Sequence, residues 1–361
     1  MRIISWEQVS DNNNLNTVRM KSAVGFLRAA WMQAVRLTEA RMGSIVSSNM
    51  LTGNMERGIL EALAYSDIFD YPLRLDELHR YLPIRVGVEQ LSEILDSMNT
   101  QVKKREGFYF LTGRAEIVDI RKQRKKLSER LLPHALRYGR MLGSLPFVRM
   151  VAMTGSLAVL NASHKADFDY LLVMVPGGLW TGRAFAVTLG RIMRLFGHRI
   201  CVNLLLSEKV LTWQPHDLYS AREICQMIPI TGIDRYDRFR SANTWTESFL
   251  PNARSSAPDY VKTPARKGSN HFQRLMEWIL RRAFDVSLER WAMKFQLRRM
   301  ARQYGTSAET NFSSDICQSN FHEHRQRTQK AFQSRVDALV NETAVALADT
   351  TALEVWTVQH L

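Results

Sequence analysis

Apolar residues recur along most of the chain with the period of a helix, and a few short apolar runs interrupt this pattern. The helical pattern predicts helices over residues 21–42, 58–65, 76–82, 88–98, 114–132, 180–196, 218–227, 236–251 and 327–347. The runs predict strands over residues 102–111 (a hairpin), 147–153, 167–175 and 198–206. Pro133 should break or kink the helix that precedes it, with a shorter helical stretch after it. Strands set among many helices predict an α+β fold.

Residues 56–113 have the order of a winged helix-turn-helix, with three short helices and a β-hairpin that turns at Glu106-Gly107. In a DNA reader, the helix before the wing enters the major groove and is basic or amide-rich on its outer face. Here that helix has Glu89, Glu93 and Asp96 but no Lys or Arg. We therefore favour a winged-helix-like module for packing or partner docking, and a DNA-binding regulator is the alternative.

Two carboxylates stand at the start of the strand predicted at 167–175. Asp167 and Asp169 are two positions apart, so their side chains point to the same face of the strand. Two acids on one face are costly unless a cation meets them. Mg²⁺ is the usual cation, because it binds one or two carboxylates together with the phosphates of a substrate.

This stretch resembles a known family. Gly155-Ser156, ten further residues and then Asp167-Phe168-Asp169-Tyr170 are similar to the signature of the nucleotidyltransferase superfamily typified by DNA polymerase beta. The resemblance implies a nucleotidyltransferase-like palm with a short mixed sheet over residues 114–252. It also implies that Asp167 and Asp169 bind Mg²⁺ and that Gly155 and Ser156 cradle the triphosphate of an NTP.

The chain departs from the family pattern at one position. The resemblance implies a third metal-side carboxylate on a later strand, and Asn203 stands at the corresponding place. An amide can coordinate a metal ion or contact a nucleotide through its oxygen, but it has no charge and cannot act as a base. Either two acids suffice, or one of Glu208, Asp217 and Glu223 completes the site, or the site binds a nucleotide without turning it over.

Composition adds a preference for anionic partners. The 361 residues carry a net charge of +14, and 45% of them are apolar, which is ordinary for a globular protein. The three cysteines are widely separated, which argues against a disulfide framework and fits a reducing cytoplasm. No run of about 18 apolar residues occurs and no secretory signal is recognised, so a membrane partner is not favoured.

The strongest basic patch lies in the predicted C-terminal helical domain, residues 270–361, and in the linker before it. Between residues 262 and 302, eleven Lys and Arg face three acids, with apolar residues at helical spacing. This pattern fits a groove for nucleic acid, a surface helix packed by its apolar side, or an amphipathic helix on an anionic membrane. Residues 1–55 have a similar but weaker basic helix followed by a linker, for which docking on the body of the protein is favoured.

Together these observations predict a cytoplasmic, Mg²⁺-dependent nucleotidyltransferase that moves a nucleoside monophosphate from an NTP to an acceptor hydroxyl. The alternatives are a catalytically weakened protein that binds a nucleotide or nucleic acid, and a winged-helix DNA-binding regulator. The sequence does not name the acceptor, the base of the NTP or the oligomeric state.

Overall fold

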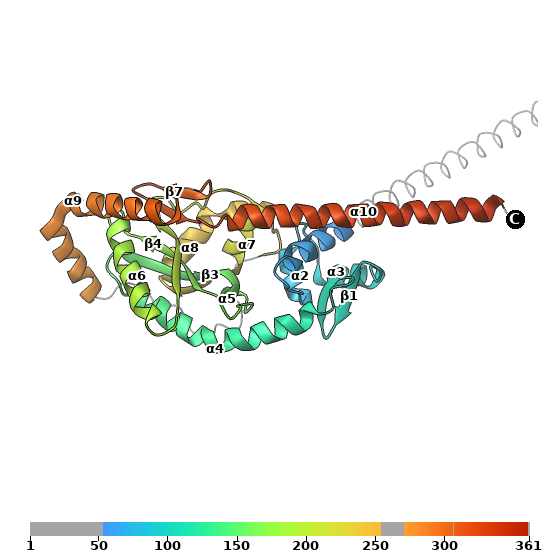
Figure 1. The fold of residues 1–361 in the computed structure, drawn as a ribbon, viewed down its shortest axis with the longest axis horizontal. Helices are drawn as coiled ribbons and strands as arrows, with labels where there is room; N and C mark the ends of the chain where they lie inside the picture. The colour runs from blue at the N-terminus through green and yellow to red at the C-terminus, as the bar shows by residue number, and fades with distance from the viewer. Residues whose placement is uncertain (1–52, 254–270, 306, 360–361) are drawn as a thin grey trace, which may run out of the picture. The chain divides into compact units, whose positions relative to one another are not determined.

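A mixed six-stranded β-sheet lies at the centre of the computed structural model, with the strand order β6-β3-β4-β5-β8-β7 (Figure 1). The structure describes residues 53–253, 271–305 and 307–359, and residues 58–361 belong to one compact unit. The helix predicted at 21–42 and almost all of the linker predicted at 253–269 lie outside the described residues.

The sheet is mixed because only one pair of its strands is parallel. Its strands are β3 Val148–Thr154, β4 Phe168–Met174, β5 Ile200–Ser207, β6 Ile228–Thr231, β7 Thr310–Phe312 and β8 Ile316–Ser319. β4 runs parallel to β5, and all other neighbours are antiparallel. The central strand β4 is apolar and fully buried from Tyr170 to Met174, as expected for a strand covered on both faces. The prediction of an α+β fold with a mixed sheet is confirmed.

Helices cover the two faces of the sheet. They are α4 Ile117–Gly143, α5 Gly155–Ala158, α6 Leu179–Arg194, α7 Leu218–Gln226, α8 Ile233–Ala242 and α9 His271–Tyr304, with a 3₁₀ helix at Thr244–Ser248. The last helix, α10 His324–Gln359, contacts α7 and extends away from the sheet (Figure 1). Along β4, Tyr170 and Leu172 pack in the core formed with α4, α6 and α9. Leu171 and Val173 pack in the opposite core, which α7 and α8 complete. By the same alternation, Asp169 lies on the side of the sheet that faces α7.

A helix–hairpin module, residues 58–113, precedes this sheet. It has a helix over residues 58–67, then α2 Leu75–Tyr81, α3 Val88–Ser97, β1 Val102–Arg105 and β2 Phe108–Leu111. β1 and β2 form the predicted antiparallel hairpin. Glu106 and Gly107 at its turn both have positive φ, the conformation that a tight two-residue hairpin turn needs.

Two cations of α4 attach to this module. Arg121 is buried and makes a bidentate ion pair with Glu77, at 2.7 and 2.6 Å. Arg124 pairs with Asp70 at 3.0 Å. Two of the basic residues of this helix therefore hold the module in place.

The structure differs from the local expectations at three places. Pro133 does not break α4, which continues to Gly143 and includes the helical stretch expected after the proline; residues such as Tyr138 and Leu142 bury against the sheet and offset the lost helical hydrogen bond. Residues 228–231, for which no strand was predicted, form the edge strand β6, where Pro229 is tolerated. The C-terminal part, expected to be helical, also supplies β7 and β8 to the sheet.

Candidate functional site

The two acids of the predicted site lie at the start of β4. Asp167 directly precedes the strand, and Asp169 is its second residue, opposite Thr154 of β3 and Cys201 of β5. Both acids line a pocket of about 960 Å³ whose other walls include parts of α6, α7 and α9. Ser156 lines the same pocket, so the predicted turn and the predicted acid pair do meet at one site.

Gly155 makes the close approach between the turn and Asp169 possible. Its φ is +67°, a backbone conformation that residues with a side chain rarely adopt. A Cβ atom on Gly155 would lie 2.5 Å from Oδ2 of Asp169. The sequence suggested this glycine for contact with phosphate, and the structure gives it a second role, which is to leave room for the carboxylate.

Glu223 of α7 is the third carboxylate at this site. Its Oε2 accepts a hydrogen bond of 3.2 Å from the backbone N–H of Gly155, and its charge raises the pKa of Asp169. The two other candidates are engaged elsewhere. Glu208 pairs with Arg235 at 3.1 Å, and Asp217 caps α7 and pairs with Arg325 at 3.1 Å.

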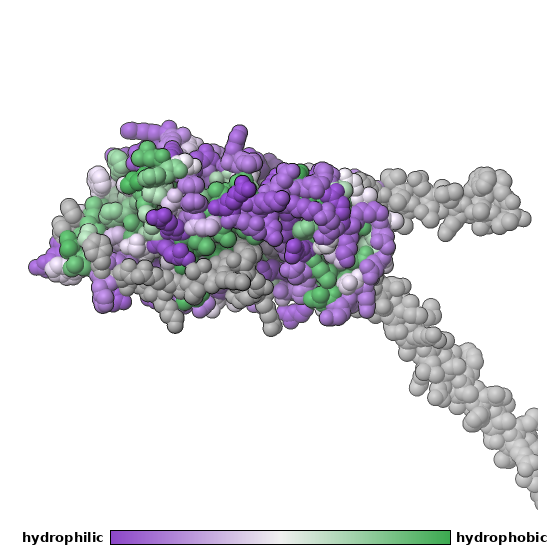
Figure 2. Space-filling view, turned by 90° about the horizontal axis from the view of Figure 1, so that it is seen from below, coloured by the Kyte–Doolittle hydropathy of each residue, from purple (hydrophilic) through white to green (hydrophobic). Residues whose placement is uncertain are grey.

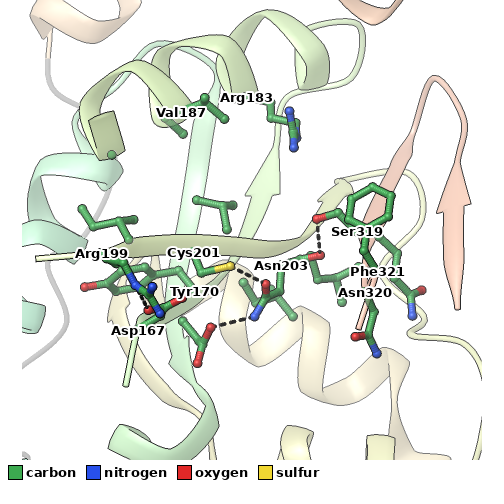
Figure 3. Close-up of a pocket in the computed structure, with 18 of the residues that line it drawn as sticks. Asp167, Tyr170, Arg183, Val187, Arg199, Cys201, Asn203, Ser319, Asn320 and Phe321 are labelled. Carbon is green, nitrogen blue, oxygen red and sulfur yellow. Dashed lines mark hydrogen bonds and ion pairs between the residues drawn. The ribbon is translucent and has the colours of Figure 1, made fainter. Parts of the chain in front are cut away.

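Asn203 of β5 orients Asp169. Its Nδ2 donates a hydrogen bond of 2.8 Å to Oδ1 of Asp169, and its Oδ1 accepts from the thiol of Cys201 at 2.7 Å (Figure 3). The amide oxygen is therefore engaged by Cys201, and the nitrogen faces the acid. In this arrangement Asn203 lines the pocket as a positioning residue for the carboxylate.

Asp167 is held by a cation. Nε of Arg199 donates to Oδ1 of Asp167 at 2.5 Å, and the two side chains lie together in Figure 3. Arg199 also donates to the backbone oxygen of Lys165 at 3.4 Å. Arg199 is more than half exposed, so this ion pair is screened by solvent and opens at low cost.

Asp169 and Glu223 have no cationic partner among the residues that the structure describes, and the pKa of each is strongly raised. Burial raises the pKa of Asp169 to about 7; the Asn203 hydrogen bond opposes the shift, and the charges of Glu223 and Asp167 add to it. Burial also raises the pKa of Glu223 to about 7, opposed by the Gly155 N–H. A bound cation would stabilise the ionised form of both acids, which burial makes unfavourable.

The donor set fits Mg²⁺ by its chemistry, because this ion prefers carboxylate oxygens and keeps other positions for water and phosphate. Asp167, Asp169 and Glu223 all line the pocket. Among the described residues, however, no three His, Cys, Asp or Glu side chains are already arranged as ligands of one metal ion. A metal ion would therefore require the Arg199–Asp167 pair to open or substrate oxygens to complete the coordination.

Sequence reasoning missed the partner of Asp167 and only named Glu223 among three options. Neither carried a local signal, because Arg199, directly before β5, and Glu223 of α7 reach the site through the fold of the sheet.

Comparisons with protein-family models, with curated proteins and with solved structures found no match. None of the helices in the described residues is long and apolar enough to cross a membrane. The function is therefore inferred from the geometry and the charges of the pocket.

Proposed function

We propose that the protein is a Mg²⁺-dependent nucleotidyltransferase that moves a nucleoside monophosphate from an NTP to an acceptor hydroxyl. The observation that supports this best is the meeting of Asp169, Glu223 and the Gly155-Ser156 turn at a pocket that Asp167 also lines. Asp169 and Glu223 lack a cationic side chain as partner among the described residues, and both have pKa values near neutrality.

In this proposal, Asp167 and Asp169 hold Mg²⁺, and Glu223 adds negative charge beside them. Bound Mg²⁺ lowers the pKa of the attacking hydroxyl and stabilises the leaving pyrophosphate. Asn203 keeps Asp169 aimed into the pocket through its 2.8 Å hydrogen bond. The N–H of Gly155 is already donated to Glu223, so Ser156 is the donor that this turn offers to a triphosphate oxygen.

Nucleotide binding without turnover is the second candidate. It is favoured by the ion pair between Asp167 and Arg199, which occupies one of the two proposed metal ligands. A site in which this pair stays closed when a nucleotide is bound retains phosphate-binding cations but lacks a ligand for the second metal ion.

The test compares pyrophosphate release from each NTP, with Mg²⁺ and a broad set of acceptors, in the wild type and in Asp167→Asn and Asp169→Asn. We expect activity in the wild type and a loss of at least a hundredfold in both variants. Asp96→Asn, an exposed acid of α3 outside the pocket, is the matched control and should be unchanged. Mg²⁺-dependent NTP binding by calorimetry without any product would support the second candidate, and neither binding nor product would refute both.

A further inference from the structure

The pocket that holds the acids has a strongly basic far wall. Arg183, Arg191 and Arg194 of α6 and Arg299 of α9 all line it. None of these four arginines makes an ion pair with a carboxylate of the described residues. The wall thus holds positive charge that no carboxylate of the described residues pairs with, in the same pocket that Asp167 and Asp169 line.

Arg183 is held in place by neutral groups. Its Nη1 donates to Oε1 of Gln296 at 2.7 Å, its Nη2 lies 3.2 Å from Sδ of Met300, and its buried Nε has no partner among the described residues. Neutral groups hold the guanidinium in place without cancelling its charge. In Figure 3, Arg183 projects from α6 on the opposite side of β5 from the side chain of Asn203. A half-buried cation with an unused donor is suited to an anionic ligand.

The arginines form a row, not a single cluster. Arg183 and Arg194 are eleven residues apart on α6, which corresponds to about 16 Å along the helix axis. One small anion cannot contact both ends of such a row. A chain of phosphates can follow it.

Exposed aromatic rings stand beside these cations. Trp291 and Phe295 of α9 stack with their ring centroids 5.4 Å apart and an angle of 10° between their planes, and both line the pocket although they are more than half exposed. Tyr304 and Phe321 form a second stacked pair at 4.8 Å in the same lining. Figure 2 shows hydrophobic side chains gathered, among hydrophilic ones, at the end of the molecule where α6 lies in Figure 1.

We propose that this wall binds single-stranded nucleic acid, with the arginine row on its phosphates and the Trp291–Phe295 stack against a base. Positive grooves lined by flat aromatic faces bind single strands because every base can stack and every phosphate is charged. That the bound strand is also the acceptor rests on the proposed transferase function, in which the end of the strand reaches Asp167 and Asp169. Binding itself does not depend on catalysis.

The test is fluorescence anisotropy of labelled single-stranded RNA and DNA, each about 12 nucleotides long, with the full-length protein. NTP is left out, so that the measurement reports on binding alone. We expect a single strand to bind at least tenfold more tightly than a duplex of equal length. Arg191→Ala/Arg194→Ala should weaken binding about tenfold and should reduce the slope of log K against log salt concentration by about 1.4, because two phosphate contacts are lost. Trp291→Ala should weaken binding of a strand about tenfold while leaving binding of inorganic polyphosphate unchanged.

The matched control is Arg137→Ala/Arg140→Ala, which removes two exposed cations of α4 outside the pocket. Equal losses in this control and in Arg191→Ala/Arg194→Ala would overturn the proposal, because they would report net charge alone. Equal affinity for polyphosphate and for a strand, or tighter binding to anionic vesicles than to any strand, would also overturn it. If strands bind as expected but no NTP is turned over, the binding wall stands and only the transferase proposal fails.

Discussion

Asn203 and Asp169 are joined by a hydrogen bond of 2.8 Å, in which the amide nitrogen donates to the carboxylate. This bond lowers the pKa of Asp169, whereas burial, the largest effect, and the charges of Glu223 and Asp167 raise it. The residue that replaces an expected third acid therefore helps the neighbouring acid to stay ionised. A carboxylate at position 203 would do the opposite in the absence of a metal ion.

Replacing Asn203 should therefore weaken metal binding through Asp169. In Asn203→Ala the pKa of Asp169 rises further above 7, so fewer molecules hold the ionised form at neutral pH. We expect the pH dependence of Mn²⁺ binding, followed by electron paramagnetic resonance, to move upward by on the order of one pH unit. Cys201→Ser is the control, because its hydroxyl still donates to the oxygen of Asn203. An identical pH dependence in Asn203→Ala and the wild type would contradict this role.

The raised pKa values of Asp169 and Glu223 also predict how stability depends on pH. Both groups have a folded pKa near 7, well above that of the unfolded chain, so the folded state binds more protons between about pH 4 and 7. Their contribution to the free energy of unfolding is fully present below about pH 4 and is lost as the pH rises through 7. Asp169→Asn should thus stabilise the protein by about 1–3 kcal/mol at pH 8 and by much less at pH 5.

Urea unfolding with a chelator present measures this difference. Added Mg²⁺ should stabilise the wild type at pH 8 more than it stabilises Asp169→Asn, because the bound ion offsets the burial of the charge. Equal stabilisation of Asp169→Asn at both pH values would mean that burial of the ionised Asp169 carboxylate does not destabilise the folded protein.

The sequence predicted well what depends on local pattern. The helix–hairpin module, the turn at Glu106-Gly107 and the strand that carries Asp169 follow from periodicity and turn residues alone. Asp167 and Asp169 could be placed on one face because a strand fixes the direction of alternate side chains. These features need no knowledge of distant parts of the chain.

What the sequence could not predict depends on contacts between distant segments. Glu223 joins Asp169 only because α7 packs on the face of the sheet toward which that acid points, and nothing near it distinguishes it from Glu208. The strands β7 and β8 are short and partly polar, so they gave no periodic signal; β8 is identified by its pairing with β5 and β7. Long-range pairing of this kind overrides local propensity.

Gly155 should be sensitive to the smallest possible side chain. Gly155→Ala adds a Cβ that would lie 2.5 Å from Oδ2 of Asp169, in addition to the strain of a positive φ. Gly113→Ala is the matched control, since Gly113 has a φ of +85° but no atom within 4 Å of the added Cβ. We expect both variants to lose about 1 kcal/mol from backbone strain, and Gly155→Ala to lose about 1–2 kcal/mol more by thermal or urea unfolding. It should also lose most metal affinity, while Gly113→Ala keeps it; equal effects would mean that the turn and Asp169 do not meet.

Glu277 attaches the basic helix α9 to the sheet, so its loss should destabilise the protein. Its carboxylate is buried, accepts from the backbone N–H of Phe147 at 2.7 Å and makes a bidentate ion pair with Arg149 at 2.7 and 2.6 Å. Glu277→Ala leaves Arg149 without its partner, and we expect a loss of about 2–4 kcal/mol in the free energy of unfolding.

Two comparisons separate this role from a general effect of charge. Glu129→Ala, which removes an exposed acid 3.7 Å from Lys125 on α4, should cost less than about 0.5 kcal/mol. Arg149→Met/Glu277→Leu should recover part of the loss, because no buried charge is then left unpaired. Since α9 carries Trp291 and Arg299, Glu277→Ala should also weaken binding of single strands at temperatures well below its unfolding midpoint. A variant that unfolds earlier yet binds strands with unchanged affinity would show that α9 keeps its place on the sheet without this ion pair.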